Sequence, residues 1–113
     1  MPISMLSWLV LAYLYVTGWG MPLTQVAILD VEMEETSGLI NLGGRIITHN
    51  DSGGTPSLYE IDTTTGGIAR RVWINGTTTR DWEDICRDDT YIYIGDIGNN
   101  FGSRTDLAVY RVP

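Results

Sequence analysis

The chain has 113 residues, with 14 acidic and 7 basic side chains and a net charge of −7. This length is enough for one small domain. An acidic domain repels phosphate backbones and anionic lipid surfaces, which argues against nucleic acid and membrane surfaces as partners. The single cysteine, Cys86, excludes an intrachain disulfide, and its apolar surroundings predict a small buried side chain.

The first charged side chain along the chain is Asp30. Before it, "MLSWLVLAYLYV" (residues 5–16) is almost wholly apolar, and small residues follow. This order is typical of a secretory signal peptide, with cleavage expected after Gly18 or Gly20. The alternative is a membrane anchor over residues 3–23, because that stretch approaches the about 20 apolar residues of a spanning helix. We therefore expect the mature protein to be secreted or held at the cell surface.

The chain thus divides into residues 1–20, a signal peptide or anchor, and residues 21–113. In the second part, runs rich in Ile, Val, Tyr and Thr alternate with Gly, Asp and Asn clusters, which is the pattern of strands and hairpins. The runs predict strands at residues 38–41, 45–50, 57–62, 69–75, 84–87, 91–96 and 107–112. Turns are predicted at residues 63–67 and 75–79, the second from its Asn-Gly pair. The expected fold class is all-β.

The chain also matches itself when it is shifted by 45 residues. The coinciding pairs include Ile47 and Ile92, Asp51 and Asp96, and Gly53 and Gly98. A period of about 40–50 residues with four strands per unit is typical of a β-propeller blade. The pattern predicts a partial β-propeller of about two four-stranded antiparallel blades, at about residues 35–75 and about residues 80–113, the second incomplete. The alternative is an ordinary antiparallel meander.

Because propellers usually close with about four to eight blades, two blades leave an apolar face and open strand edges. The expected partners are therefore the remaining blades of a longer protein, or further copies that close the propeller by self-association. A protein or carbohydrate ligand is a further candidate, since Trp82 and several tyrosines could stack on a sugar or peptide. Packing between the blades is the favoured role for Tyr59 and Tyr110, which recur in the repeat.

Three motifs, "NDSGG" from Asn50, "DWEDI" from Asp81 and "GDIGNN" from Gly95, resemble a group of secreted or surface-anchored bacterial β-propeller proteins, most of them described only as hypothetical proteins. The resemblance covers about residues 35–112 and implies a propeller fold and an extracytoplasmic location. More distantly, the arrangement is similar to six-bladed, calcium-dependent propellers of the gluconolactonase and paraoxonase type. In those, acidic and amide side chains near the central channel hold a metal. No motif of this chain aligns residue by residue with their full ligand set.

Carboxylates and amides stand beside several predicted strands, and calcium takes about six to eight oxygen ligands of these kinds. The candidate calcium ligands are Glu83, Asp84, Asp96, Asn99, Asn50 and Asp51. Asp and Asn after a strand also hydrogen-bond the turn backbone and hold it closed, and this role is favoured for Asp51 and Asp96 because they recur. Glu83 and Asp84 stand apart, because the first blade has no acidic side chain at their positions.

No serine nucleophile motif, metal-binding histidine pair or phosphate loop is present in the sequence. Asp81, Glu83 or Asp84 could act as general acid or base, and Arg80 is expected to pair with Asp81. The only histidine, His49, is expected to be a structural residue of a strand. The sequence therefore favours a binding or scaffold module without a catalytic motif. The alternative is the N-terminal part of a calcium-dependent hydrolase of lactonase or esterase type.

Overall fold

The computed structural model describes residues 20–113, so the expected signal segment lies almost wholly outside the described residues. A single 3-10 turn, η1 (Val31–Met33), precedes seven strands. These are β1 (Thr36–Leu42), β2 (Arg45–Asn50), β3 (Ser57–Ile61), β4 (Ile68–Trp73), β5 (Trp82–Arg87), β6 (Ile92–Asp96) and β7 (Ala108–Val112). All seven predicted strands are confirmed, with ends that differ by at most two residues. Within residues 20–113, no helix has the length and apolar character that crossing a membrane requires.

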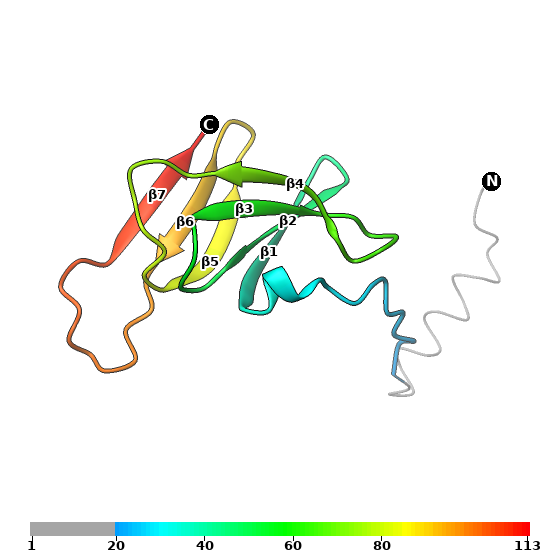
Figure 1. The fold of residues 1–113 in the computed structure, drawn as a ribbon, viewed down its shortest axis with the longest axis horizontal. Coiled ribbons are helices and arrows are strands. Elements are labelled where there is room, and N and C mark those ends of the chain that lie inside the picture. The colour runs from blue at the N-terminus through cyan, green and yellow to red at the C-terminus, as the bar shows by residue number, and fades with distance from the viewer. Residues whose placement is uncertain (1–19) are drawn as a thin grey trace.

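The strands form two antiparallel sheets in which neighbours in the chain are neighbours in the sheet (Figure 1). The first sheet contains β1–β4 and the second contains β5–β7. Glycine makes the tight connection between β1 and β2 at low cost, because Gly43 and Gly44 have φ values of 60° and 85°. The described part of the chain is therefore all-β, as predicted.

The first hairpins of the two sheets share one pairing pattern. Each has a single register shift near the start of its first strand. The pairs on either side of it are Thr36–Asn50 and Gly38–His49 in the first sheet, and Trp82–Asp96 and Asp84–Gly95 in the second. The two sets correspond when 46 is added to the residue numbers of the first. The sequence comparison used 45, and the difference of one residue makes Asn50, rather than Asp51, the equivalent of Asp96.

The main core lies between the two sheets. Its buried members are Ile47 and Leu58 from the first sheet and Trp82, Ile85 and Ile94 from the second. The first strands of the sheets, β1 and β5, are also joined directly. The Ser37 hydroxyl donates to the carbonyl oxygen of Trp82 at 2.7 Å, and Arg87 Nε donates to that of Asn41 at 2.7 Å. The two sheets are therefore held together both by apolar packing and by hydrogen bonds along one seam.

A second, smaller core covers the other side of the first sheet. Met33, from η1, packs there on Tyr59 and Ile61 and is only 1% exposed. The chain before η1 is anchored by a hydrogen bond of 2.9 Å from the Asp30 N–H to the carbonyl oxygen of Gly66. Asp30 also caps η1, because its side chain accepts a hydrogen bond from the Glu32 N–H. Tyr59 therefore packs on the side of the first sheet that faces away from the second, so the expected role for it in packing between the blades is wrong.

The prediction that Cys86 is buried is wrong, because its side chain is exposed. Successive side chains of a strand point to opposite faces of the sheet. Its neighbour Ile85 is buried against the first sheet, so Cys86 points to the outer face of the second sheet. Tyr110 is half-buried and packs on the main core, which confirms the packing role expected for it.

Candidate functional site

Three carboxylates converge at the end of the seam between the sheets. Asp51 follows β2, Asp81 precedes β5, and Glu83 lies within β5; one oxygen from each lies within 4.8 Å of those of the other two. Asp51 and Asp81 are half-buried and Glu83 is exposed. Within the described residues, no arginine forms an ion pair with any of the three. We call Asp51, Asp81 and Glu83 the acidic cluster.

The cluster brings three acidic side chains close together, so their negative charges repel one another. A hydrogen bond with Asp81 raises the pKa of Glu83, and burial and the negative charges of Asp81 and Asp51 raise it further. Like-charged carboxylates at this separation disfavour each other's ionised form. Protonation of Glu83, or a bound cation, would relieve the repulsion.

Backbone hydrogen bonds hold the cluster in position. The Trp82 N–H donates to the carbonyl oxygen of Asp51 at 2.6 Å, which ties the loop after β2 to the start of β5. The Gly98 N–H donates to the carbonyl oxygen of Asp81 at 3.1 Å. A side chain at Gly98 would overlap the Asp81 carboxylate. The cluster therefore combines one residue of β5 with residues of two loops, and backbone hydrogen bonds fix both loops.

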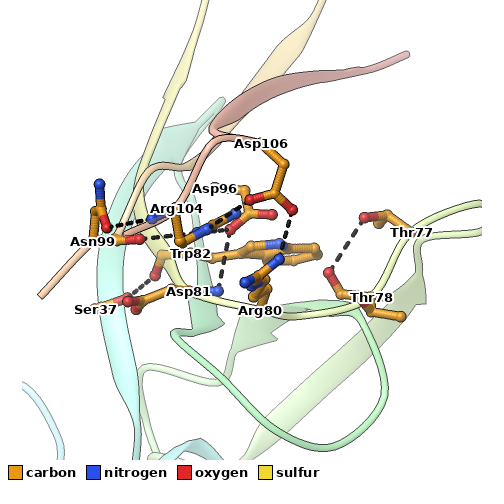
Figure 2. A network of polar contacts seen from close by, with 11 residues as sticks. Ser37, Thr77, Thr78, Arg80, Asp81, Trp82, Asp96, Asn99, Arg104 and Asp106 are labelled. Atoms are coloured by element: carbon orange, nitrogen blue, oxygen red, sulfur yellow. Dashed lines mark hydrogen bonds and ion pairs between the residues drawn. The ribbon is translucent and has the colours of Figure 1, made fainter. Parts of the chain in front are cut away.

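Asp96, beside the cluster, has a different role (Figure 2). Arg104 Nη1 donates to Asp96 Oδ1 at 2.9 Å and to the carbonyl oxygen of Gly98 at 2.9 Å. The side chains of Arg104 and Asp96 are 8% and 4% exposed, so this is a buried ion pair. The hydrogen bond to Asp96 raises the pKa of Arg104. Asp96 also accepts from the Asp81 N–H at 3.1 Å, so its contacts are structural, but they are with Arg104 and the segment before β5 rather than with the backbone of the turn that follows it.

The loop after β6 is closed by the same arginine. Asn99 Oδ1 accepts a hydrogen bond from the Arg104 N–H at 3.0 Å, and Arg104 Nε donates to Asp106 at 3.1 Å. This hydrogen bond lowers the pKa of Asp106. Arg80 pairs with Asp106 rather than with Asp81, so the expected Arg80–Asp81 pair is wrong. The contacts of Asn99 and Asp106 are those of loop closure.

Of the four candidate calcium ligands that are carboxylates, the structure groups Asp51 and Glu83 in the acidic cluster, and it adds Asp81. Asn50 donates from Nδ2 to the carbonyl oxygen of Glu32 at 2.9 Å. Asp84 accepts from the N–H of Ile85, the next residue, at 2.8 Å. Among the contacts within residues 20–113, the side chain of Asp51 accepts only from the Ser52 hydroxyl, at 3.1 Å, so the turn-closing role favoured for it does not hold.

Sequence reasoning assigned no part to Arg104, and it considered Asp81 as a general acid or base and as the partner of Arg80 but not as a metal ligand. Arg104 was detectable in principle, since it is the one basic residue in the loop between β6 and β7, which follows Asp96 at the end of β6. No feature of the sequence indicates that Asp51 and Asp81 lie close together. Their proximity depends on how the two sheets pack.

His49 and Trp82 lie side by side in the core, with ring centroids 5.9 Å apart in an edge-to-face arrangement. Both are fully buried, and His49 Nδ1 is hydrogen-bonded to the carbonyl oxygen of Asn50 at 2.9 Å. His49 is therefore a packed strand residue, as expected, and it is closed off from substrate.

The chain matches no protein-family model, no curated protein and no solved structure in the comparisons we made.

Proposed function

We propose that the two sheets are neighbouring blades of a secreted or surface β-propeller and act as a binding or scaffold module. The observation that carries this proposal is the direction in which the sheets stack. Ile85, Ile92 and Ile94 of the second sheet face the first sheet. Their equivalents at the offset of 46 are Leu39, Ile46 and Thr48.

These equivalents lie on the side of the first sheet that faces away from the second. Leu39 and Ile46 line an apolar groove there, together with the segment before η1. The front of one sheet therefore packs on the back of the next, as blades do in a propeller. Two sheets of a simple sandwich would instead bury equivalent faces against each other. The stacking supports the blade interpretation over the meander.

The proposed location outside the cytoplasm rests on the sequence, namely the apolar segment followed by small residues before Asp30. The resemblance of the loop motifs to secreted bacterial propellers points the same way.

We further propose that the acidic cluster binds calcium and thereby fixes the two blades to each other. Carboxylate oxygens are the ligands that this cation prefers. The cluster offers three of them, one from β5 and two from the loops that follow β2 and precede β5, without an arginine to neutralise them among the described residues. A divalent cation there would replace carboxylate repulsion with attraction, and would favour the ionised form of Glu83.

Calcium titration calorimetry on the full chain, with the melting temperature followed in parallel, tests this site. Calcium should bind and raise the melting temperature, because a ligand that binds only the folded state stabilises it by mass action. Glu83→Gln should weaken binding about tenfold or more, since it removes a charged ligand. Asp84→Asn is the matched control, because Asp84 is the next residue but lies outside the cluster, and its affinity should equal that of the wild type. No binding heat and no thermal shift, or equal losses in both variants, would remove calcium from the proposal.

The second candidate is a calcium-dependent lactonase or esterase. One observation favours it: Glu83 lies beside two other carboxylates that raise its pKa, and a raised pKa is the direction of shift that a carboxyl group acting as general acid or base requires. Calcium-stimulated hydrolysis of an aryl ester or a δ-lactone that Glu83→Gln abolishes and Asp84→Asn retains would support it. Calcium binding without such hydrolysis would argue against the hydrolase and favour the binding or scaffold module.

A further inference from the structure

Asn75 and Gly76 form an exposed turn in the connection between the two sheets. The turn follows β4, and both residues are exposed. Gly76 has a φ of 88°, and nothing lies within 4 Å of the position that a side chain would occupy there. Glycine adopts such a φ at low cost, which is why Asn-Gly pairs are typical of turns. A side-chain amide and the backbone N–H that follows it therefore lie together at the surface.

No hydrogen bond holds either group. In the part of the chain that the structure describes, neither the Asn75 side chain nor the Gly76 N–H has a hydrogen-bond partner. The residues on either side of the turn are held instead. The Ile74 N–H and the Thr79 hydroxyl donate, at 2.9 Å and 2.8 Å, to carbonyl oxygens of the loop between β2 and β3. The turn can therefore change its backbone torsions without breaking a hydrogen bond of either sheet.

The chain has four other asparagines, and none combines these features. Asn41 accepts a hydrogen bond of 2.8 Å from the backbone of the turn after β1, and Asn50 and Asn99 make the contacts described above. Asn100 is the closest match, since it is also exposed in a turn, but Phe101 follows it. A side chain on the following residue hinders approach to the backbone nitrogen of that residue, and glycine has none.

We propose that Asn75 is a site of spontaneous, intramolecular deamidation. The Gly76 nitrogen loses its proton to solvent base and attacks Cγ of Asn75. An N–Cγ bond forms, the Cγ–Nδ2 bond breaks, and ammonia leaves with a proton from water. Water then opens the resulting cyclic imide at one of its two carbonyl groups. The reaction involves no oxidation or reduction, and it is favoured because both reacting groups belong to the same short segment.

Either product changes the connection between the sheets. Opening of the imide at Cγ leaves aspartate, and opening at the main-chain carbonyl leaves isoaspartate, whose backbone runs through Cβ and Cγ. The net charge of −7 becomes one unit more negative in both cases. Isoaspartate also lengthens the main chain by one methylene group between β4 and β5. Because Ile74 and Thr79 are held on either side, the strands keep their pairing.

The experiment follows Asn75 and its matched control, Asn100, in the same sample. The full chain is incubated in the folded state and digested with trypsin at intervals, and the digest is analysed by mass spectrometry. Cleavage after arginine places Asn75 in the peptide of residues 72–80 and Asn100 in that of residues 88–104. The first peptide should gain the mass of replacing NH2 by OH and separate into aspartyl and isoaspartyl forms. The second should stay unchanged over the same time.

Two comparisons test the structural argument. Because an exposed turn without hydrogen bonds needs no opening, the folded chain should deamidate within about tenfold of the rate of a free peptide of residues 72–80. Gly76→Ala should slow the reaction towards the rate at Asn100, both in the folded chain and in the free peptide, where stability plays no part. The wild-type rate should be higher in mildly alkaline than in mildly acidic buffer, because the attacking nitrogen must lose a proton.

A folded chain that stays unmodified while the free peptide reacts would mean that the turn protects Asn75, and it would overturn the inference. Equal loss of the amide at Asn75 and Asn100 would overturn it as well, as would a rate that Gly76→Ala leaves unchanged in both chain and peptide.

Discussion

Asp96 and Glu83 belong to adjacent strands, yet their carboxylates have opposite surroundings. Asp96 is buried against the guanidinium of Arg104, whereas Glu83 is exposed and faces Asp81 and Asp51. Burial of a charge is tolerated where a partner of opposite charge compensates it. The first carboxylate therefore belongs to the scaffold, and the second is available for a ligand.

Glu83 should make the folded chain less stable as pH rises. Its pKa is raised in the folded state, so the folded state binds more protons than the unfolded state between the ordinary and the raised pKa. The stabilisation is fully present below the ordinary pKa of a glutamate and is lost as pH rises through the raised value. In calcium-free buffer, Glu83→Gln should thus be more stable than the wild type at pH 7, by at most about 1 kcal/mol because solvent screens an exposed group.

Urea denaturation of both proteins across pH 3.5–8 would measure this difference (the range brackets carboxylate titration, about pH 4 and above). The two curves should converge at the acidic end. A variant that is less stable than the wild type at pH 7 would contradict the proposed repulsion. Calcium should reverse the order at pH 7, if it binds the cluster.

The residues of the cluster were only partly predictable from the sequence. Glu83 was singled out because it departs from the repeat, and Asp51 because it recurs. The one-residue difference between the sequence offset and the pairing offset moved Asp51 out of the turn position, which Asn50 occupies instead. A shift of one residue exchanges the faces of a strand, and spacing alone does not fix it.

The strands themselves were predictable, because β-branched and aromatic runs between Gly, Asp and Asn clusters report on local pairing. What the pattern did not indicate was the segment before β1. Leu29 and Met33 pack on the outer side of the first sheet, although residues 21–35 have no strand or helix periodicity. The contact depends on Gly66, far along the chain, and such long-range packing has no local signature.

Gly66→Ala should detach this N-terminal segment. Gly66 has a φ of 78°, and a side chain there would overlap the backbone of Ile28. The control is Gly76→Ala, which has a similar φ of 88° but open space around it. Both variants should lose stability from backbone strain. Gly66→Ala should lose at least about 1 kcal/mol more than Gly76→Ala, because the overlap involves backbone atoms that must move.

Thermal or urea denaturation would give the difference in stability between the two glycine variants. Hydrogen exchange would show which amides lose protection. Exchange of the Asp30 and Met33 amides should accelerate only in Gly66→Ala, because both are hydrogen-bonded at this end of the chain. Equal losses in the two variants would mean that the segment contributes little to the folded state.

At the scale of the whole molecule, the main core belongs to neither sheet alone, since Leu58 comes from the first sheet and Ile94 from the second. We therefore expect the two sheets to unfold as one cooperative unit. Leu58→Ala should cost about 2–5 kcal/mol, the usual range for removing a buried leucine side chain. The loss of stability should be equally large in the second sheet, because the cavity forms in the core that both sheets share.

Native-state hydrogen exchange measures the loss of stability in each sheet separately. In Leu58→Ala, the protection of the β6 amides should fall by the same free energy as that of the β2 amides. Leu39→Ala, on the same sheet but 62% exposed, should change both by less than about 0.5 kcal/mol. If β6 kept its protection while β2 lost it, the sheets would open independently. The proposal that the two sheets are stacked blades with a shared core would then be wrong. Joint loss of protection would mean that each sheet needs the apolar face of its neighbour, which is the physical condition for building a larger ring from such units.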